Sequence, residues 1–567
     1  MKKNILTHFK SLTWFSILIL PVIFSCKAKK SYDTIIRNGM IYDGMGGEPY
    51  KADIAINDDS IMMIGDLSGA TAKDTINAHG LAIAPGFINM LSWANETLIE
   101  DGRSQSDIRQ GVTLEVFGEG WSMGPLNKRI RDREQQSQGD IKYNIEWNTL
   151  GEYLNFLERK GVSCNVASFV GATTLRDYVI GEDNRAPTPA ELDSMVLLVR
   201  QAMEEGAMGV GTSLIYPPAF FAKTEEIIAL CKEASAHGGS YISHMRSEGN
   251  KLNEAVEELI RISKEANIHA EIYHLKAGGK DNWAKMDSVI RRVERARKEG
   301  QDITADMYTY TAGATGMTAA FPPSLQDGGF GKLRERLMNP KIRAEMKKAM
   351  LSNPSDWENL YYGAGGAENV LLLSFKQDSL KKFTGKSLAE VAVIRGTSPE
   401  ETAMDLIIQD STRVGVAYFL MLEENVKKQV AIPWVSFGSD EGSYTNEGIF
   451  LKSNAHPRAY GTFIRVLGKY VRDEKVISLQ EAIRKLSNLP ATNLKLKRRG
   501  SISVGNFADL VIFDPAKVRD KSSFQQPHQY AEGILYVWVN GKKVLDKGVH
   551  TGAKPGRFVK GPGYKKP

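Results

Sequence analysis

The middle of the chain alternates apolar, β-branched runs with amphipathic stretches of helical spacing. Helical patterns occur, for example, at Thr224–His237, Leu252–Ala266 and Trp283–Glu299. Strands that alternate with helices form a parallel sheet, and eight such strands close into a (β/α)8 barrel. The sequence therefore predicts an α/β chain built on a TIM-like barrel. The eight predicted strands are Ala82–Leu91, Thr113–Glu119, Ser163–Gly171, Met208–Tyr216, Gly239–Met245, His269–Lys276, Asp302–Tyr310 and Trp434–Glu441.

Short β-branched runs separated by turn residues flank this barrel at both ends of the chain. They occupy residues 32–77 and 508–545, and the two sets predict one small β-sandwich built from both termini. We therefore divide the chain into a first sandwich half at 26–80, a barrel at 81–490, and a second sandwich half with a tail at 491–567. About 120 residues separate the last two barrel strands, far more than one connection needs. We expect this insertion, at 311–433, to cover the barrel mouth.

The first 25 residues have the pattern of an export signal. Lys2, Lys3 and Lys10 precede an apolar segment, Ser11–Phe24, that is too short to span a bilayer comfortably. It runs into Ile-Phe-Ser-Cys26, which resembles the lipobox of bacterial lipoproteins, where the cysteine is acylated. We predict a lipoprotein signal peptide at 1–25, a lipid anchor at Cys26, and attachment to the cell envelope on the periplasmic side. A plain cleaved signal and an uncleaved anchor are the alternatives.

Charge and cysteine content narrow the class of protein further. The formal net charge is +6. Without the three lysines of the signal segment, Lys+Arg minus Asp+Glu is 70 − 67 = +3, which argues against a nucleic-acid partner. Two cysteines, Cys164 and Cys231, remain after Cys26. Both lie in apolar or helical patterns, so we expect buried free thiols rather than a disulfide framework.

Polar side chains end several of the predicted barrel strands. His244 and His274 each end a strand, and Glu119 and Asp440 end two others. Active sites of such barrels lie at the C-terminal ends of the strands. A single histidine there is commonly structural, but two on adjacent strands together with carboxylates favour a metal site. Imidazole and carboxylate ligands suit zinc.

Eight short motifs occur in a fixed order along the chain. They are Ala84-Pro-Gly-Phe-Ile, Gln110-Gly-Val-Thr, Tyr216-Pro-Pro-Ala, Tyr241-Ile-Ser-His-Met-Arg-Ser-Glu-Gly, His274-Leu-Lys, Thr304-Ala-Asp-Met-Tyr-Thr-Tyr, Gly438-Ser-Asp and His456-Pro-Arg-Ala-Tyr-Gly-Thr-Phe. This is the order seen in D-aminoacylases, and from Tyr32 to Gly548 the chain resembles an N-acyl-D-amino-acid deacylase of the amidohydrolase superfamily. The resemblance implies a metal-dependent amide hydrolase that acts on a small acylated amino acid or a short peptide.

The chain departs from the family pattern at two places. Members of the family carry His-x-His on the first strand, whereas this chain has Leu91 and Trp93. These side chains cannot ligate a metal, which predicts one zinc ion per chain rather than two. Family members also have a cysteine ligand near Gly118-Glu119-Gly120, where Glu119 is the nearest replacement and Glu115 a weaker one. The predicted ligands are Glu119, His244 and His274, with a fourth position left open.

The resemblance also implies roles for other residues. Asp440 would move the proton between the attacking water and the leaving amine, although a helix N-cap is a simpler role for it. Tyr216 and Arg458 would bind the substrate carboxylate, for which arginine offers a bidentate fork. Alternatively, Tyr216 is a turn residue and Arg458 is a surface charge. The same resemblance places Lys276 and His456 near the site as substrate-binding residues, and a structural ion pair is equally open for Lys276.

Two further functions remain open from the sequence. One is a cyclic-amide hydrolase of the dihydroorotase or hydantoinase type, for which the Tyr216 and Arg458 motifs are less suited. The other is a non-catalytic binding lipoprotein that kept the barrel after the first-strand histidines were lost. The presence of His244, His274 and Asp440 argues against that loss of function, because random decay would not spare all three.

Overall fold

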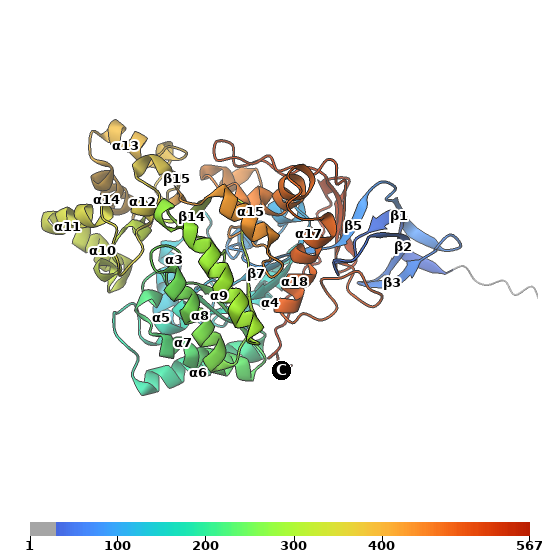
Figure 1. Ribbon diagram of the computed structural model, residues 1–567, viewed down its shortest axis with the longest axis horizontal. Helices are drawn as coiled ribbons and strands as arrows, with labels where there is room; N and C mark the ends of the chain where they lie inside the picture. Colours follow the sequence, from blue (N-terminus) through green and yellow to red (C-terminus); the bar gives the residue numbers. More distant parts are fainter. Residues whose placement is uncertain (1–29, 567) are drawn as a thin grey trace, which may run out of the picture.

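The computed structural model describes residues 30–566. The predicted signal segment and Cys26 lie outside the described residues. A barrel occupies the centre of the molecule, with a sheet formed by both termini at one end and an inserted subdomain at the opposite end (Figure 1). Within residues 30–566, no helix has the length and apolar character needed to cross a membrane.

The barrel predicted from the sequence is confirmed, with all its strands parallel. They form two sheets, β6-β7-β8 and β9-β10-β11-β12-β13. The eighth predicted strand is not regular, because residues 434–441 make only isolated parallel bridges, Ala305 with Val435 and Ser92 with Glu441. These bridges close the barrel between its last and first strands. The strands are β6 (Phe87–Asn89), β7 (Val112–Phe117), β8 (Asn165–Ser168), β9 (Val170–Gly171), β10 (Gly209–Ser213), β11 (Ser240–His244), β12 (Ala270–Ile272) and β13 (Ile303–Ala305).

Helices surround the barrel and bury one face each against it. In α9 (Met286–Lys298) the buried residues include Val289, Val293 and Ala296, at the helical spacing seen in the sequence. A 3₁₀ turn, η2 (Lys280–Lys285), precedes this helix. Cys164 and Cys231 are buried free thiols, as predicted. The other helices around the barrel are α1 (Thr97–Glu100), α2 (Gln105–Ile108), α3 (Lys128–Ser137), α4 (Leu150–Lys160), α5 (Ala172–Val179), α6 (Pro189–Glu205), α7 (Thr224–Ala236), α8 (Leu252–Ala266), α15 (Glu423–Ala431), α16 (Arg458–Arg465), α17 (Leu479–Leu486) and α18 (Asn488–Asn493).

The two chain ends form one nine-stranded sheet with its own apolar core. Its halves join where β5 runs antiparallel to β17, with Ala84 opposite Val511. The predicted strand Ala82–Leu91 therefore divides, because β5 enters this sheet and β6 enters the barrel. Gly86 lies between them, where a Cβ would come within 2.1 Å of the Thr113 side chain. The strands are β1 (Ser31–Ile41), β2 (Tyr50–Asn57), β3 (Ser60–Gly65), β4 (Thr71–Asn77), β5 (Ala82–Pro85), β17 (Leu510–Phe513), β18 (Ile534–Val539), β19 (Lys542–Asp546) and β20 (Val549–His550).

The insertion is a subdomain with a separate core beside the barrel. Its antiparallel sheet has the order β14-β16-β15. Helix α15 lies within the predicted range 311–433, but its Val426 and Val430 pack into the barrel core. The separate subdomain thus ends near Leu420. Its elements are β14 (Ala312–Gly316), α10 (Gly329–Leu337), α11 (Pro340–Met350), α12 (Leu360–Gly363), β15 (Val370–Ser374), α13 (Leu388–Arg395), α14 (Pro399–Asp410) and β16 (Gly415–Phe419).

Candidate metal centre and active site

A cavity of about 1020 Å³ opens at the C-terminal ends of the barrel strands. Barrel residues form its floor, and strands β14 and β16 of the insertion contribute to its wall through Gly313, Thr315 and Val416. Seven of the predicted site residues line it together. They are Glu119, Tyr216, His244, His274, Lys276, Asp440 and Arg458.

Three buried side chains on this floor converge on one point. Glu119 follows β7, His244 ends β11, and His274 follows β12. Glu119 Oε1 lies 2.9 Å from His244 Nδ1 and 2.7 Å from His274 Nε2. One ligand atom from each residue lies within 4.8 Å of the other two, and no second group of this kind occurs in residues 30–566. The arrangement can hold one metal ion on two imidazoles and a carboxylate.

Glu115, the weaker candidate ligand, does not reach this point. It lies inside the barrel wall, where Ser92 Oγ donates to its Oε2 over 3.0 Å. Burial, with Asp107 nearby, raises the pKa of Glu115 well above its usual range. Glu115 lies within β7, whereas Glu119 follows the end of the strand, and Glu119 alone of the two joins the histidines.

Glu248 is a site residue that the sequence reasoning did not single out. Its Oε1 lies 2.9 Å from His274 Nδ1, the nitrogen that faces away from Glu119, and 2.6 Å from Lys276 Nζ. Burial disfavours the charged carboxylate, but His244 and Lys276 outweigh it and lower the pKa of Glu248. A carboxylate in this position can orient the His274 ring, a supporting role common at metal sites. The feature of the sequence that could have identified Glu248 is its position four residues after His244, within the same motif.

Lys276 is buried and paired rather than free in the cavity. Its Nζ lies 2.7 Å from His274 Nδ1 as well as against Glu248, and 5.6 Å from the centre of the Tyr308 ring. This is the structural ion pair that the sequence left open. Lys276 still lines the cavity, so a substrate-binding role for it stays a prediction.

The backbone is strained at two residues of the site. His274 has φ = 34° and Asp440 has φ = 53°, values that side chains other than glycine rarely adopt. Two hydrogen bonds hold these conformations: His274 N–H donates to Asp306 Oδ1 over 2.8 Å, and Asp440 N–H donates to Leu91 O over 2.8 Å. Such conformations persist only where the surroundings fix them.

Asp440 and Arg458 form a buried ion pair at the edge of the metal centre. Arg458 Nη1 lies 2.7 Å from Asp440 Oδ2, but its N–H does not point at the oxygen, and neither Nε nor Nη1 donates a hydrogen bond within the described residues. Arg458 begins α16, with its guanidinium 4.4 Å from the centre of the Tyr308 ring. Asp440 does not cap a helix, because the next helical turn starts at Gly448. Both side chains therefore face the cavity.

Tyr216 and His456 differ in their relation to the cavity. Tyr216 lines it, with its ring 5.1 Å from that of His244. His456 is fully buried behind the wall, where its Nε2 donates to Ala312 O over 3.0 Å and its Nδ1 accepts from Arg458 N–H over 3.1 Å. His456 contacts the backbone of Arg458 and does not line the cavity, so a substrate-binding role for it stays a prediction.

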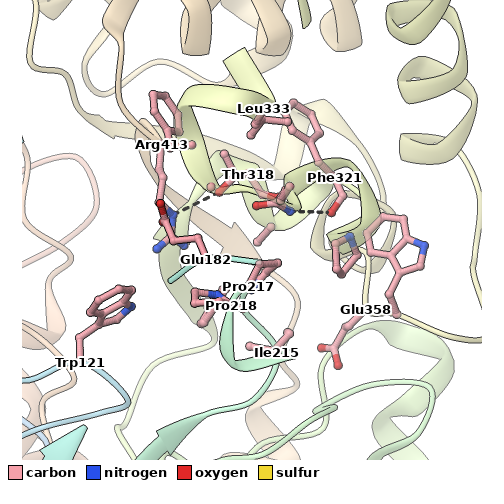
Figure 2. A pocket seen from close by; sticks show the side chains of 17 residues that line it. Trp121, Glu182, Ile215, Pro217, Pro218, Thr318, Phe321, Leu333, Glu358 and Arg413 are labelled. Carbon is pink, nitrogen blue, oxygen red and sulfur yellow. Dashed lines mark hydrogen bonds between the residues drawn. The ribbon is translucent and has the colours of Figure 1, made fainter. Parts of the chain in front are cut away.

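A side pocket of about 120 Å³ shares Tyr216 and Arg413 with the lining of the main cavity. Figure 2 shows the side chains that line it. Apolar groups form much of its wall, among them Ile215, Phe321 and Leu333. Arg413 stands beside it, where its Nε donates to Thr318 Oγ1 over 3.2 Å and its guanidinium lies 5.0 Å from the centre of the Tyr216 ring. The pocket offers space for a mainly apolar group, with Arg413 and the carboxylates of Glu182 and Glu358 in its wall.

Comparisons with known proteins agree with this geometry. The model of the Amidohydrolase family matches residues 383–545. The D-aminoacylase of Alcaligenes xylosoxydans xylosoxydans is 32% identical over 529 residues, which are 93% of this chain and 97% of that protein. This chain belongs to the D-aminoacylase family of amidohydrolases. The first-strand departure at Leu91 and Trp93 is thus a feature of a member of this family.

Solved structures of D-aminoacylase-family enzymes share the whole fold. One is a D-aminoacylase, whose structure is described in terms of the functional role of its binuclear metal centre, with one-metal activation and second-metal attenuation. It has a TM-score of 0.77 at 30% identity, and the match covers 93% of this chain and 100% of that one. The N-acyl-D-glutamate deacylase of Bordetella bronchiseptica, complexed with zinc and a phosphonate inhibitor, has a TM-score of 0.77 at 26% identity, covering 94% and 100%. A dihydroorotase of Bacillus subtilis is 24% identical over only 48% of this chain and 59% of that protein.

Proposed function

We propose that this protein is a metal-dependent deacylase of N-acyl-D-amino acids. The observation that carries the proposal is the meeting of a three-ligand centre, a carboxylate and a guanidinium with free donors in one cavity. The family supplies the reaction class, hydrolysis of a carbon–nitrogen bond other than a peptide bond, and the relatives named above act on acylated D-amino acids.

The metal is proposed to be one zinc ion held by Glu119, His244 and His274. Two imidazole nitrogens and a carboxylate oxygen suit Zn²⁺. The three side chains are buried, and one ligand atom from each lies within 4.8 Å of the other two, so a single ion could contact all three. Leu91 and Trp93 provide no atoms for a second ion. When bound, zinc would polarise the amide carbonyl and lower the pKa of a water molecule towards ~7.

Asp440 would carry the proton in this reaction. Its carboxylate would accept a proton from the attacking water and return it to the amide nitrogen as the C–N bond breaks. The products are a free amino acid and the carboxylic acid of the acyl group. Burial raises the pKa of Asp440, while Arg458 acts against that rise. The ion pair therefore favours the ionised carboxylate that a base requires.

Arg458 would bind the α-carboxylate of the substrate. Its Nε and Nη1 make no hydrogen bond within residues 30–566, and the residue lines the cavity, so these two N–H groups are the donors that we assign to the planar anion. A hydantoin or dihydropyrimidine ring has no carboxylate for these donors to bind. The unpaired donors thus favour an acylated amino acid over these two rings; dihydroorotate, which does carry a carboxylate, is distinguished by the turnover test. A non-catalytic binding protein would not need the strained Asp440 beside the metal centre.

The test uses purified residues 27–567 loaded with one equivalent of zinc. The panel comprises N-acetyl-D-amino acids with neutral and acidic side chains, their L-enantiomers, hydantoin and dihydroorotate. Acidic side chains are included because Arg413 lies beside the side pocket. We expect release of D-amino acids. Turnover of the cyclic amides alone would establish the dihydroorotase-type function instead, and binding without turnover of any amide would establish a binding protein.

A separate proposal concerns the location of the protein. We propose that it is exported and anchored to the cell envelope through a lipid on Cys26, which the pattern of residues 1–26 supports. Labelling of cells with palmitate should mark the protein, and Cys26→Ala should abolish the label. A wild-type protein without label, released in soluble form after export, would contradict the anchor.

A further inference from the structure

Trp93 is partly exposed at the mouth of the metal centre, yet its polar edge is turned inwards. The residue is 36% exposed, among the large hydrophobic side chains least covered by the fold. Its indole Nε1 donates to Glu119 Oε2 over 2.9 Å and to Asp440 Oδ1 over 3.2 Å. One N–H group thus links the carboxylate of the metal centre with the carboxylate that handles the proton.

The backbone fixes the indole between the strands that carry these two acids. Trp93 N–H donates to Glu441 O over 2.9 Å, and the preceding Ser92 N–H donates to Val116 O over 2.8 Å. Val116 belongs to β7, the strand that leads to Glu119, and Glu441 follows Asp440. The side chain therefore starts from a rigid point, and its N–H position does not depend on a flexible loop.

The bonds divide the four carboxylate oxygens in a consistent way. Glu119 Oε1 faces the two ligand histidines, whereas Oε2 faces the indole. Asp440 Oδ2 faces Arg458, whereas Oδ1 faces the indole. Within the described residues the indole is the only hydrogen-bond donor to Glu119 Oε2 and to Asp440 Oδ1. It leaves one oxygen of Glu119 free for the metal and fixes the direction of Asp440.

We propose that Trp93 is a positioning residue whose indole N–H holds Glu119 as a one-oxygen metal ligand and aligns Asp440 beside it. The role of Asp440 in this statement rests on the proposed function; the role of Glu119 rests on the metal centre alone. An indole suits this task because it donates one hydrogen bond, carries no charge and offers no lone pair to a metal. The two carboxylates are thereby linked by a neutral donor, while Arg458 pairs with the other oxygen of Asp440.

The test compares Trp93→Phe with Trp121→Phe. Phenylalanine keeps an aromatic ring at the site and removes the N–H. Trp121 lines the same cavity, and its indole donates no hydrogen bond within residues 30–566, so its substitution is the matched control. Each variant is titrated with zinc and with cobalt(II), whose absorption spectrum reports the ligand geometry. Circular dichroism establishes that both are folded.

We expect Trp93→Phe to bind metal ~10- to 100-fold more weakly, with a changed cobalt spectrum, and the metal-saturated enzyme to lose kcat by a similar factor with KM nearly unchanged. Trp121→Phe should match the wild type in metal affinity and spectrum. Unchanged metal affinity in Trp93→Phe overturns the proposal, as does an equal loss in Trp121→Phe. Because the metal titration needs no substrate, it decides the proposal even if no acylated amino acid is hydrolysed.

Discussion

Replacement of Arg458 by methionine should remove the preference of the enzyme for substrates with a free carboxylate. Methionine fills much of the buried space but offers no N–H group and no charge. In the wild type, Arg458 Nε and Nη1 have no hydrogen-bond acceptor within the described residues, while Nη1 lies 2.7 Å from Asp440 Oδ2. The side chain thus has two tasks, to bind the substrate anion and to stabilise the Asp440 carboxylate.

The size of the effect follows from these two tasks. A hydrogen bond to a charged group contributes ~1.5–3 kcal/mol, so two such bonds, partly offset by the cost of dehydrating the substrate anion, give ~2–4 kcal/mol. At 1.36 kcal/mol for each factor of ten, the loss in kcat/KM for the acid is ~30- to 1000-fold. Loss of the Asp440 partner raises the pKa of that carboxylate further and lowers kcat for every substrate alike.

The assay therefore measures a ratio. N-acetyl-D-amino acids are compared with the corresponding N-acetyl-D-amino acid amides, which lack the carboxylate, in wild type and Arg458→Met. The matched control is Arg465→Met, in the same helix, where the arginine is paired with Asp520 over 3.0 Å and does not line the cavity. The wild type should prefer the acid, and only Arg458→Met should lose that preference. An unchanged ratio would refute the assignment of Arg458 to the substrate carboxylate.

The remaining predictions concern the proton, the metal and pH. Asp440→Asn is nearly isosteric but cannot act as a base, so kcat should fall by ~10²–10⁴ while zinc content, measured by elemental analysis, stays at about one per chain. His244→Ala and His274→Ala should each lose both bound zinc and activity on dialysis. Retention of two equivalents of zinc by the dialysed wild type would contradict the single centre. Burial lowers the pKa of Lys485 to about 7, and its ammonium donates to Ile432 O over 2.8 Å. Between pH ~7 and ~10 the unfolded chain therefore binds more protons than the folded chain, and the free energy of unfolding should rise with pH. Lys485→Met lacks this contribution and is the reference. If the free energies of unfolding of both proteins, measured with denaturant, depend on pH in the same way, this titration is excluded.

Much of the fold and of the metal centre could be predicted from the sequence. Apolar runs that alternate with helical patterns identify parallel strands, and their spacing gave eight positions around a barrel. A polar residue that ends such a run must lie at the catalytic face, because parallel strands have their C-terminal ends at the same face. This reasoning predicts that Glu119, His244 and His274 lie close together, and the structure places their ligand atoms within 4.8 Å of one another.

The tertiary structure decided what each side chain faces. The sequence placed Arg458 and His456 together near the substrate, but packing turned His456 behind the wall and set Arg458 against Asp440. It also brought Trp93 to Asp440, 347 positions away in the sequence. In the sequence Trp93 is notable only because it cannot ligate a metal, whereas in the structure its indole donates a hydrogen bond to Asp440. Periodicity fixes which residues end a strand and which face of it they share. The atoms that meet across the barrel depend on rotamers and strand register, which only the packed core determines.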